Sequence, residues 1–436
     1  MVDKLLLFPS TAEISDDRGH LIVGGCDTAE LAAEFGTPLY LFDELTLRHK
    51  CQEFNTEFGQ RYADTTVIYA CKAFINKALA LIFNEEGLGL DVVSAGELGI
   101  ARAVDFPLDR AYFHGNNKSA EEIRLALGWN IGHIVVDNFQ ELAIVDEIAK
   151  EQGCKADILL RLSPGVDPHT HKYITTGSVD SKFGFPLARG EEAIVQALSM
   201  ANLNLVGLHF HLGSLIFEIE PYQQAIGLIL DFAAEMGQKH GFELRELDVG
   251  GGIAIQYTLD SPAPPISAYA EAIASNITTK CRQLHLTLPR LIIEPGRAVV
   301  GQAGVALYRV GTVKDIPGVR RYVSVDGGMA DNIRPALYGA KHEAVVANKM
   351  LAKEAGEVTI AGKFCESGDI LVRDINLPSV AAGDIIAIPD SGAYCLSMAS
   401  NYNASLKPAV VLVKEGKARL IRRRETLDDL TRCDLA

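Results

Sequence analysis

Eight short apolar runs, most of them followed by a stretch of helical periodicity, limit most strongly how this chain can fold. The runs end near residues 72, 94, 115, 138, 163, 214, 252 and 297. Apolar residues recur with helical spacing at 77–86, 95–104, 120–127, 140–152, 191–200, 222–240 and 268–284. Strands that alternate with helices in this way predict an α/β fold built on a (β/α)8 TIM barrel. A doubly wound open sheet is the alternative.

The flanks of this pattern have a different character. From about residue 303 the helical spacing fades, and strand-like runs separated by turns predict an all-β module. Strand-like residues before position 37 have no partner in the barrel, so we expect them to join that module. A chain of 436 residues suits two domains. We therefore expect a barrel over 37–300 and a β-sandwich or β-barrel domain made of 1–36 and 301–436.

Composition excludes several classes of protein. A formal net charge of −15 argues against nucleic acid as the main partner. No apolar run approaches the length of a membrane span. The apolar stretch among the first residues is too short for a secretory signal. The eight cysteines show neither Cys-x-x-Cys pairs nor zinc spacing. We expect a cytoplasmic protein with reduced thiols, no membrane contact and no metal site.

Lys72 ends the first barrel strand, directly after an apolar run at 66–71. We expect apolar neighbours to bury it, and burial favours the neutral, nucleophilic amine. A lysine of this kind can hold an aldehyde cofactor as a Schiff base, although a lone lysine more often only opens a loop. Further polar residues follow the other strands, at the face where barrel enzymes place their active sites. These include Asp91, His114, Arg161, His209, His211, Asp248 and Glu294.

Glycine-rich segments follow the seventh and eighth strands, where barrel enzymes often bind phosphate. A glycine-rich strand end can also be only a tight turn. Glu294 could be a surface carboxylate, or it could keep a pyridinium nitrogen protonated. His211 could be a core histidine, or its ring could stack on a flat cofactor. The candidate phosphate-binding segments are Gly250–Gly252 and Gly296–Arg297, with Gly213 and Ser214 after the strand before them.

Two stretches of the β module carry reactive groups. Arg334 lies in a polar loop and could form a forked contact with a carboxylate. Cys365 stands beside Glu366. A cysteine is usually a small buried apolar residue, but a thiol can also reprotonate a carbanion.

Taken together, these residues make the chain resemble the diaminopimelate decarboxylases, pyridoxal-phosphate enzymes of the alanine-racemase-like fold type. The matching motifs together are highly specific, and the stretch from Asp331 to Tyr338 favours this family over the ornithine and arginine decarboxylases. The motifs lie at residues 69–73, 91–98, 117–119, 182–184, 209–214, 250–252, 294–297, 331–339, 365–369 and 392–394. The chain departs from the usual family pattern at Phe74, Ser163 and Leu215.

The resemblance implies a role for each matching residue. Lys72 would carry the cofactor, His211 would back its ring, Glu294 would face its nitrogen, and Cys365 would be the acid. The implied cofactor-binding residues are Lys72, Asp91, His211, Ser214, Gly251, Gly252, Glu294, Gly296, Arg297 and Tyr394. The implied substrate-binding residues are Arg297, Arg334, Tyr338, Glu366 and Tyr394. The family also implies a homodimer whose active sites are shared, with Cys365 and Glu366 acting across the interface.

The implied reaction is decarboxylation of meso-2,6-diaminopimelate to L-lysine and CO2, the last step of lysine biosynthesis. The alternatives are a decarboxylase of another diamino acid or polyamine precursor, such as ornithine, arginine or carboxynorspermidine, or a racemase. A non-catalytic cofactor-binding regulator is the rival from a different class, but such proteins lack a β domain.

Overall fold

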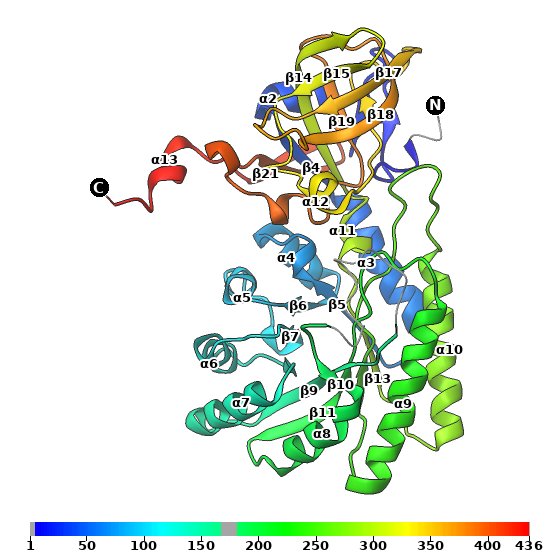
Figure 1. Ribbon diagram of the computed structural model, residues 1–436, viewed down its shortest axis with the longest axis vertical. Helices are drawn as coiled ribbons and strands as arrows, with labels where there is room; N and C mark the ends of the chain where they lie inside the picture. The colour runs from blue at the N-terminus through cyan, green and yellow to red at the C-terminus, as the bar shows by residue number, and fades with distance from the viewer. Residues whose placement is uncertain (1–4, 167–180, 436) are drawn as a thin grey trace. The chain divides into compact units, whose positions relative to one another are not determined.

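The computed structural model describes residues 5–166 and 181–435, and its contacts divide the chain into two compact units (Figure 1). The barrel unit comprises Cys51–Ala254 and Ala263–Gly296. The sheet unit comprises Met1–Lys50, Ile255–Pro262 and Arg297–Ala436. The domain boundaries expected from the sequence, 37–300 for the barrel and 1–36 with 301–436 for the β domain, stay a prediction.

The barrel unit contains a closed ring of eight parallel strands. Neighbours pair in the order β9-β11-β12-β13-β5-β6-β7-β8, and β8 pairs with β9 to close the ring. The predicted barrel is therefore confirmed. Its interior is filled by apolar side chains from most of the strands, namely Ile68, Tyr112, Val135, Leu159, Val206 and Ile292. The strands are β5 (Thr65–Ala70), β6 (Gly89–Val92), β7 (Ala111–Phe113), β8 (His133–Val136), β9 (Ala156–Ser163), β11 (Leu203–His209), β12 (Glu246–Asp248) and β13 (Arg290–Ile293).

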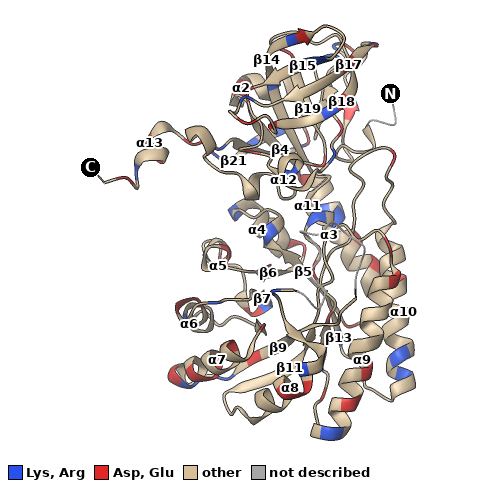
Figure 2. Ribbon diagram, viewed as in Figure 1, with Lys and Arg blue, Asp and Glu red and all other residues tan. Residues whose placement is uncertain are grey.

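Helices follow most of these strands, and local sequence explains where several of them begin. Asn76, Ser94, Ser119 and Asn138 each accept a backbone N–H of the next turn, as N-cap residues do. Charges of both signs lie along α7, α9 and α10, as expected for the solvent side of amphipathic helices (Figure 2). The expected helical stretches are confirmed as α4 (Lys77–Glu85), α5 (Ala95–Arg102), α6 (Ala120–Gly128), α7 (Phe139–Gln152), α8 (Gly190–Ser199), α9 (Glu220–His240) and α10 (Ile266–Leu284).

The sheet unit is built on a nine-stranded mixed sheet of order β18-β17-β15-β14-β4-β20-β21, with β19 paired to β14 and β16. The early strands β1 (Glu13–Ile14), β2 (Leu21–Val23) and β3 (Cys26–Asp27) form a small sheet of their own, but Leu21 and Val23 pack into the core of the large one. The large sheet comprises β4 (Leu39–Asp43), β14 (Gly304–Ile316), β15 (Arg320–Val325), β16 (Val345–Val346), β17 (Glu354–Ala361), β18 (Ile370–Pro378), β19 (Ile385–Ile388), β20 (Ala409–Lys414) and β21 (Lys417–Arg422).

Among the helices of residues 5–166 and 181–435, none has both the length and the apolar character needed to span a membrane.

Candidate active site

Lys72 lies at the mouth of the barrel, in the short 3-10 turn Cys71–Ala73 that directly follows β5. Its Nζ is 3.6 Å from Oδ2 of Asp91. Asp91 lies in the neighbouring strand β6, where it pairs with Ala70 of β5, and it is almost fully buried. The expected burial of Lys72 is wrong, because 40% of its side chain is exposed. In the 3-10 turn, Cys71 and Ala73 bury their side chains and Lys72 does not.

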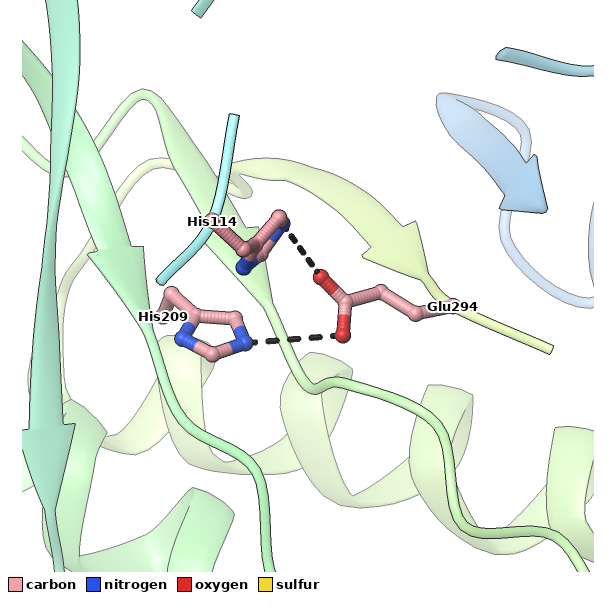
Figure 3. Close-up of side chains that lie close together, drawn as sticks. All are labelled: His114, His209 and Glu294. Atoms are coloured by element: carbon pink, nitrogen blue, oxygen red, sulfur yellow. Dashed lines mark ion pairs between the residues drawn. The ribbon is translucent and has the colours of Figure 1, made fainter. Parts of the chain in front are cut away.

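Three side chains from the ends of three different strands meet beside Asp91, and we call His114, His209 and Glu294 the His–Glu cluster (Figure 3). Nε2 of His114 is 2.8 Å from Oε1 of Glu294, and Nε2 of His209 is 3.6 Å from Oε2. All three residues are buried. The sequence marked both histidines as polar strand ends but predicted no role for them.

The carboxyl groups around this cluster differ in the direction of their pKa shifts. Burial alone would raise the pKa of Glu294, but the neighbouring histidines, His114 foremost, hold it well below its usual value. Burial lowers the pKa of His209 to about 3, so this ring is neutral at physiological pH. Burial and the charge of Glu294 raise the pKa of Asp248 well above its usual value. Burial also raises the pKa of Asp91, against the opposing effect of His114 and Lys72. Glu294 is thus the carboxylate that stays ionised most firmly.

The ligand-type atoms of the His–Glu cluster lie within 4.8 Å of one another, close enough to surround a metal ion. Two imidazole nitrogens and a carboxylate oxygen are ordinary zinc ligands. The absence of a metal, expected from the spacing of the cysteines, stays a prediction.

The glycine-rich segment packs against the backbone of two neighbouring strand ends. A Cβ on Gly251 would lie 2.1 Å from the carbonyl oxygen of Glu294, and one on Gly252 would lie 2.4 Å from that of Gly213. Gly252 also has φ near +101°, which favours glycine. The backbone N–H of Gly251 donates to Nδ1 of His211 at 3.2 Å. Because of this bond, the Nδ1 edge of the His211 ring faces the glycine-rich loop.

The other predicted barrel residues lie on the same rim. Ser214 and Leu215 follow β11, and Leu215 adopts a left-handed conformation with φ of 59°. Gly296 lies directly after β13, against Ala70 and Ala73 beside Lys72.

Local contacts accommodate two of the three departures from the family pattern, Phe74 and Ser163. Phe74 is buried, and its backbone N–H and carbonyl both bond to the hydroxyl of Tyr69. Ser163 ends β9 and donates to the carbonyl oxygen of Phe183 at 2.7 Å.

In the sheet unit, two of the predicted residues contact one tyrosine that the sequence did not single out. Arg297 donates from Nη1 to the hydroxyl of Tyr257 at 2.7 Å, and its guanidinium lies 4.5 Å from the ring centre of Tyr394. The guanidinium of Arg334 lies 4.3 Å from the ring centre of Tyr257. No periodicity marks Tyr257, because it lies outside the helices and strands.

Arg334 is a buried cation, with only 2% of the residue exposed. Burial lowers the pKa of its guanidinium, but Tyr257, Cys395 and Asp390 outweigh this and raise it. Burial raises the pKa of Asp390 well above its usual value, so this carboxyl is a poor source of negative charge. Within residues 5–166 and 181–435, Arg334 has no carboxylate at ion-pair distance.

The remaining predicted residues also lie in the sheet unit. Cys365 is exposed and Glu366 accepts a hydrogen bond of 2.6 Å from the hydroxyl of Tyr402, in the loop between β17 and β18. Tyr338 ends the short helix α12 (Arg334–Tyr338), and its hydroxyl lies 4.0 Å from the sulfur of Met398. Cys365 and Glu366 therefore lie in a loop, whereas Arg297 begins the short helix α11 (Arg297–Val300) and Arg334, expected in a polar loop, begins α12.

Comparisons with known proteins agree with this geometry. The family model "Pyridoxal-dependent decarboxylase, pyridoxal binding domain" matches residues 45–301. Diaminopimelate decarboxylase of Bacillus subtilis (strain 168) is 47% identical over 96% of this chain and 96% of its own length. A crystal structure of diaminopimelate decarboxylase from M. jannaschii in complex with L-lysine has a TM-score of 0.92, with 38% identity and 98% of each chain covered. That from Helicobacter pylori, also with L-lysine, has a TM-score of 0.86 with 35% identity, and 93% of this chain and 98% of the other are covered.

Proposed function

Because this chain belongs to the diaminopimelate decarboxylases, a family of pyridoxal-dependent carboxy-lyases, we propose that it converts meso-2,6-diaminopimelate to L-lysine and CO2. This is the last step of lysine biosynthesis. The identity to curated relatives extends over almost the whole chain, so the proposal includes the barrel and the β domain.

The residues of the barrel mouth fit pyridoxal phosphate by their chemistry. The chain offers an exposed amine on Lys72 for the aldehyde, an ionised Glu294 for the ring nitrogen and a glycine-rich loop for the phosphate. The residues proposed to hold it are Lys72, Asp91, His211, Ser214, Gly251, Gly252, Glu294, Gly296, Arg297 and Tyr394. When bound, this cofactor supplies an electron sink for the bond to the departing carboxylate.

The protein's own part is to hold charges and protons in place. Glu294, kept ionised through its contact with His114, would hold a proton on the pyridine nitrogen. Asp91 would hold the Lys72 ammonium at the barrel rim until the amine is deprotonated. His211 would face the cofactor with a neutral ring. The ring is neutral because burial, and then the charge of Lys72, lower its pKa well below the usual value.

The buried Arg334 is the observation that carries the choice of substrate. A buried charge without a carboxylate at ion-pair distance is costly, so such a cation suits a site where the ligand supplies the anion. Diaminopimelate has a second carboxylate to offer, and ornithine has none. Arg297, Tyr338 and Tyr394 would complete the carboxylate contacts, and Glu366 would accept the distal amino group.

The decisive assay is to mix purified protein, loaded with pyridoxal phosphate, with diaminopimelate, ornithine, arginine and carboxynorspermidine in turn and to measure CO2. We expect release from diaminopimelate far above the others. Release from ornithine, arginine or carboxynorspermidine but not from diaminopimelate would make one of those alternatives the function. Interconversion of stereoisomers without CO2 would favour the racemase.

We further propose a homodimer in which Cys365 and Glu366 complete the site of the partner, with Cys365 as the proton donor. The exposure of Cys365 supports this, since a thiol that acts on another chain has to be accessible. The test mixes a Lys72→Ala chain with a Cys365→Ala chain. Shared sites should restore up to about a quarter of the normal activity, because half of randomly assorted dimers are mixed and half of their sites are intact. Sites within one chain should restore nothing, once mass measurement has confirmed subunit exchange.

We also propose a cytoplasmic location. Cys154, Cys365 and Cys433 are exposed thiols, which a reducing compartment preserves. Fractionation of cells followed by detection of the protein would test this.

A further inference from the structure

Tyr257 is the common contact of the two arginines proposed to bind carboxylates. Its hydroxyl accepts from Nη1 of Arg297 at 2.7 Å, and the guanidinium of Arg334 lies 4.3 Å from its ring centre. All three residues belong to the sheet unit, so this arrangement is internal to one compact unit. One phenol side chain therefore contacts both cations, one through its polar end and one through its ring.

His342 holds Arg334 from a second direction. Its Nε2 lies 3.2 Å from Nη1 of Arg334, and its ring meets the ring of Tyr257 edge to face at 5.4 Å. A guanidinium can only donate, so Nε2 of His342 must be the acceptor, and the ring must be neutral for that contact. Burial and the charge of Arg334 lower the pKa of His342 well below its usual value, which agrees with a neutral ring.

We propose that Tyr257 and His342 are positioning residues that fix the guanidinium groups of Arg297 and Arg334 relative to each other. This inference rests on the proposed function, and it concerns how the enzyme selects a substrate that carries a carboxylate at each end. An arginine side chain has many rotamers, and ordering it only when substrate binds would weaken binding. Contacts that order it in advance strengthen the binding of a distal carboxylate and leave substrates without one unaffected.

The first test replaces the acceptor of Arg334. His342→Leu has a similar volume but accepts no hydrogen bond, whereas the amide oxygen of His342→Gln can accept near the position of Nε2. We expect His342→Leu to raise the KM for diaminopimelate about tenfold or more, as loss of a hydrogen bond to a charged group does. The kcat should change less than about threefold, and His342→Gln should recover much of the loss. His240→Leu, at an exposed histidine that ends α9, is the matched control.

The second test separates the two ends of Tyr257. Tyr257→Phe removes the acceptor of Arg297 and keeps the ring against Arg334, while Tyr257→Leu removes both contacts. We expect the KM for diaminopimelate to rise in the order wild type, Phe, Leu. Residual activity on ornithine should fall less than activity on diaminopimelate in both variants, since ornithine has no distal carboxylate. Tyr257→Phe deletes only one hydroxyl, so it keeps the inference testable if His342→Leu does not fold.

The outcomes separate this inference from the proposed function. A wild type that releases no CO2 from diaminopimelate would refute the proposed function and the positioning role with it. If the wild type is active, an unchanged KM in Tyr257→Phe and in each folded His342 variant would refute the positioning role alone. Equal losses on diaminopimelate and ornithine, or no rescue by His342→Gln, would also refute it, since they would show a general structural role. Cofactor content and thermal unfolding identify variants that are merely misfolded.

Discussion

Replacing Arg334 by methionine should lower activity and yet leave the protein as stable as before, or more so. The two effects have opposite signs because Arg334 is a buried cation with no carboxylate at ion-pair distance in the described chain. Folding must therefore carry the cost of burying its charge. Substrate binding would be the event that compensates for it.

The size of each effect follows from the contacts of Arg334. Replacing a buried ion by an apolar side chain of similar volume is neutral or stabilises by about 1–4 kcal/mol. Removing Arg334 also leaves Nε2 of His342 without its donor, at a cost of about 1 kcal/mol. We therefore expect the free energy of unfolding to change by about −1 to +3 kcal/mol, so that any loss of stability is small. The loss of a buried contact to the distal carboxylate should cost about 2–4 kcal/mol in kcat/KM, or about 30- to 700-fold.

The assay pairs urea unfolding with steady-state CO2 release, at equal cofactor occupancy. Arg245→Met is the matched control, because Arg245 is exposed and its side chain donates to Asn204 and to the carbonyl oxygen of Leu205. It should change stability by less than about 0.5 kcal/mol and leave kcat/KM unchanged. If Arg334→Met instead destabilised the protein by several kcal/mol and left kcat/KM intact, Arg334 would be a structural ion and the argument from its burial would fail.

Three further predictions concern the barrel. Borohydride reduction followed by peptide mapping should attach the cofactor to Lys72, and a label on another lysine would contradict the assignment. Gly251→Ala should lower cofactor retention measured by absorbance, because its Cβ would lie 2.1 Å from the backbone of Glu294 and the loop would have to shift. Burial lowers the pKa of His209 from 6.5 to about 3, so its contribution to stability is complete above pH 6.5 and is lost as pH falls toward 3. Over that range the loss approaches about 5 kcal/mol, and His209→Gln should flatten the dependence of unfolding on pH.

The barrel could be predicted because its information is local. Each strand is a short apolar run, and residues such as Ser119 and Asn138 mark where the next helix begins. Strand pairing in the sheet unit is not local. The runs before residue 37 belong to the sheet unit, yet they pair with one another and not with the strands of the large sheet. Hydrophobic pattern alone does not specify which distant strand provides the partner.

The candidate site was predictable to the extent that polar residues follow barrel strands. Glu294 and His211 could be named in this way. The contacts of Glu294 with His114 and His209, however, form only when the ring of eight strands closes, and no single segment of sequence encodes that closure. The exposure of Lys72 depends on the 3-10 turn after β5, and strand propensity does not reveal it. Tyr257 and His342 lie outside regular elements, so no periodic signal marks them.

Each unit buries an ionised group of the proposed site, and these two groups, Glu294 and Arg334, have opposite charges. In the barrel unit, Asp91, Asp248 and Glu294 are close enough that their charges interact, and burial makes it unfavourable for all three to be ionised. The histidine contacts decide that Glu294 keeps its charge. In the sheet unit Arg334 is a buried cation that contacts His342 and the ring of Tyr257, with no carboxylate of the described residues at ion-pair distance. A sequence optimised for stability alone would have replaced both groups by apolar residues, so their retention points to the ligand charges that each one meets.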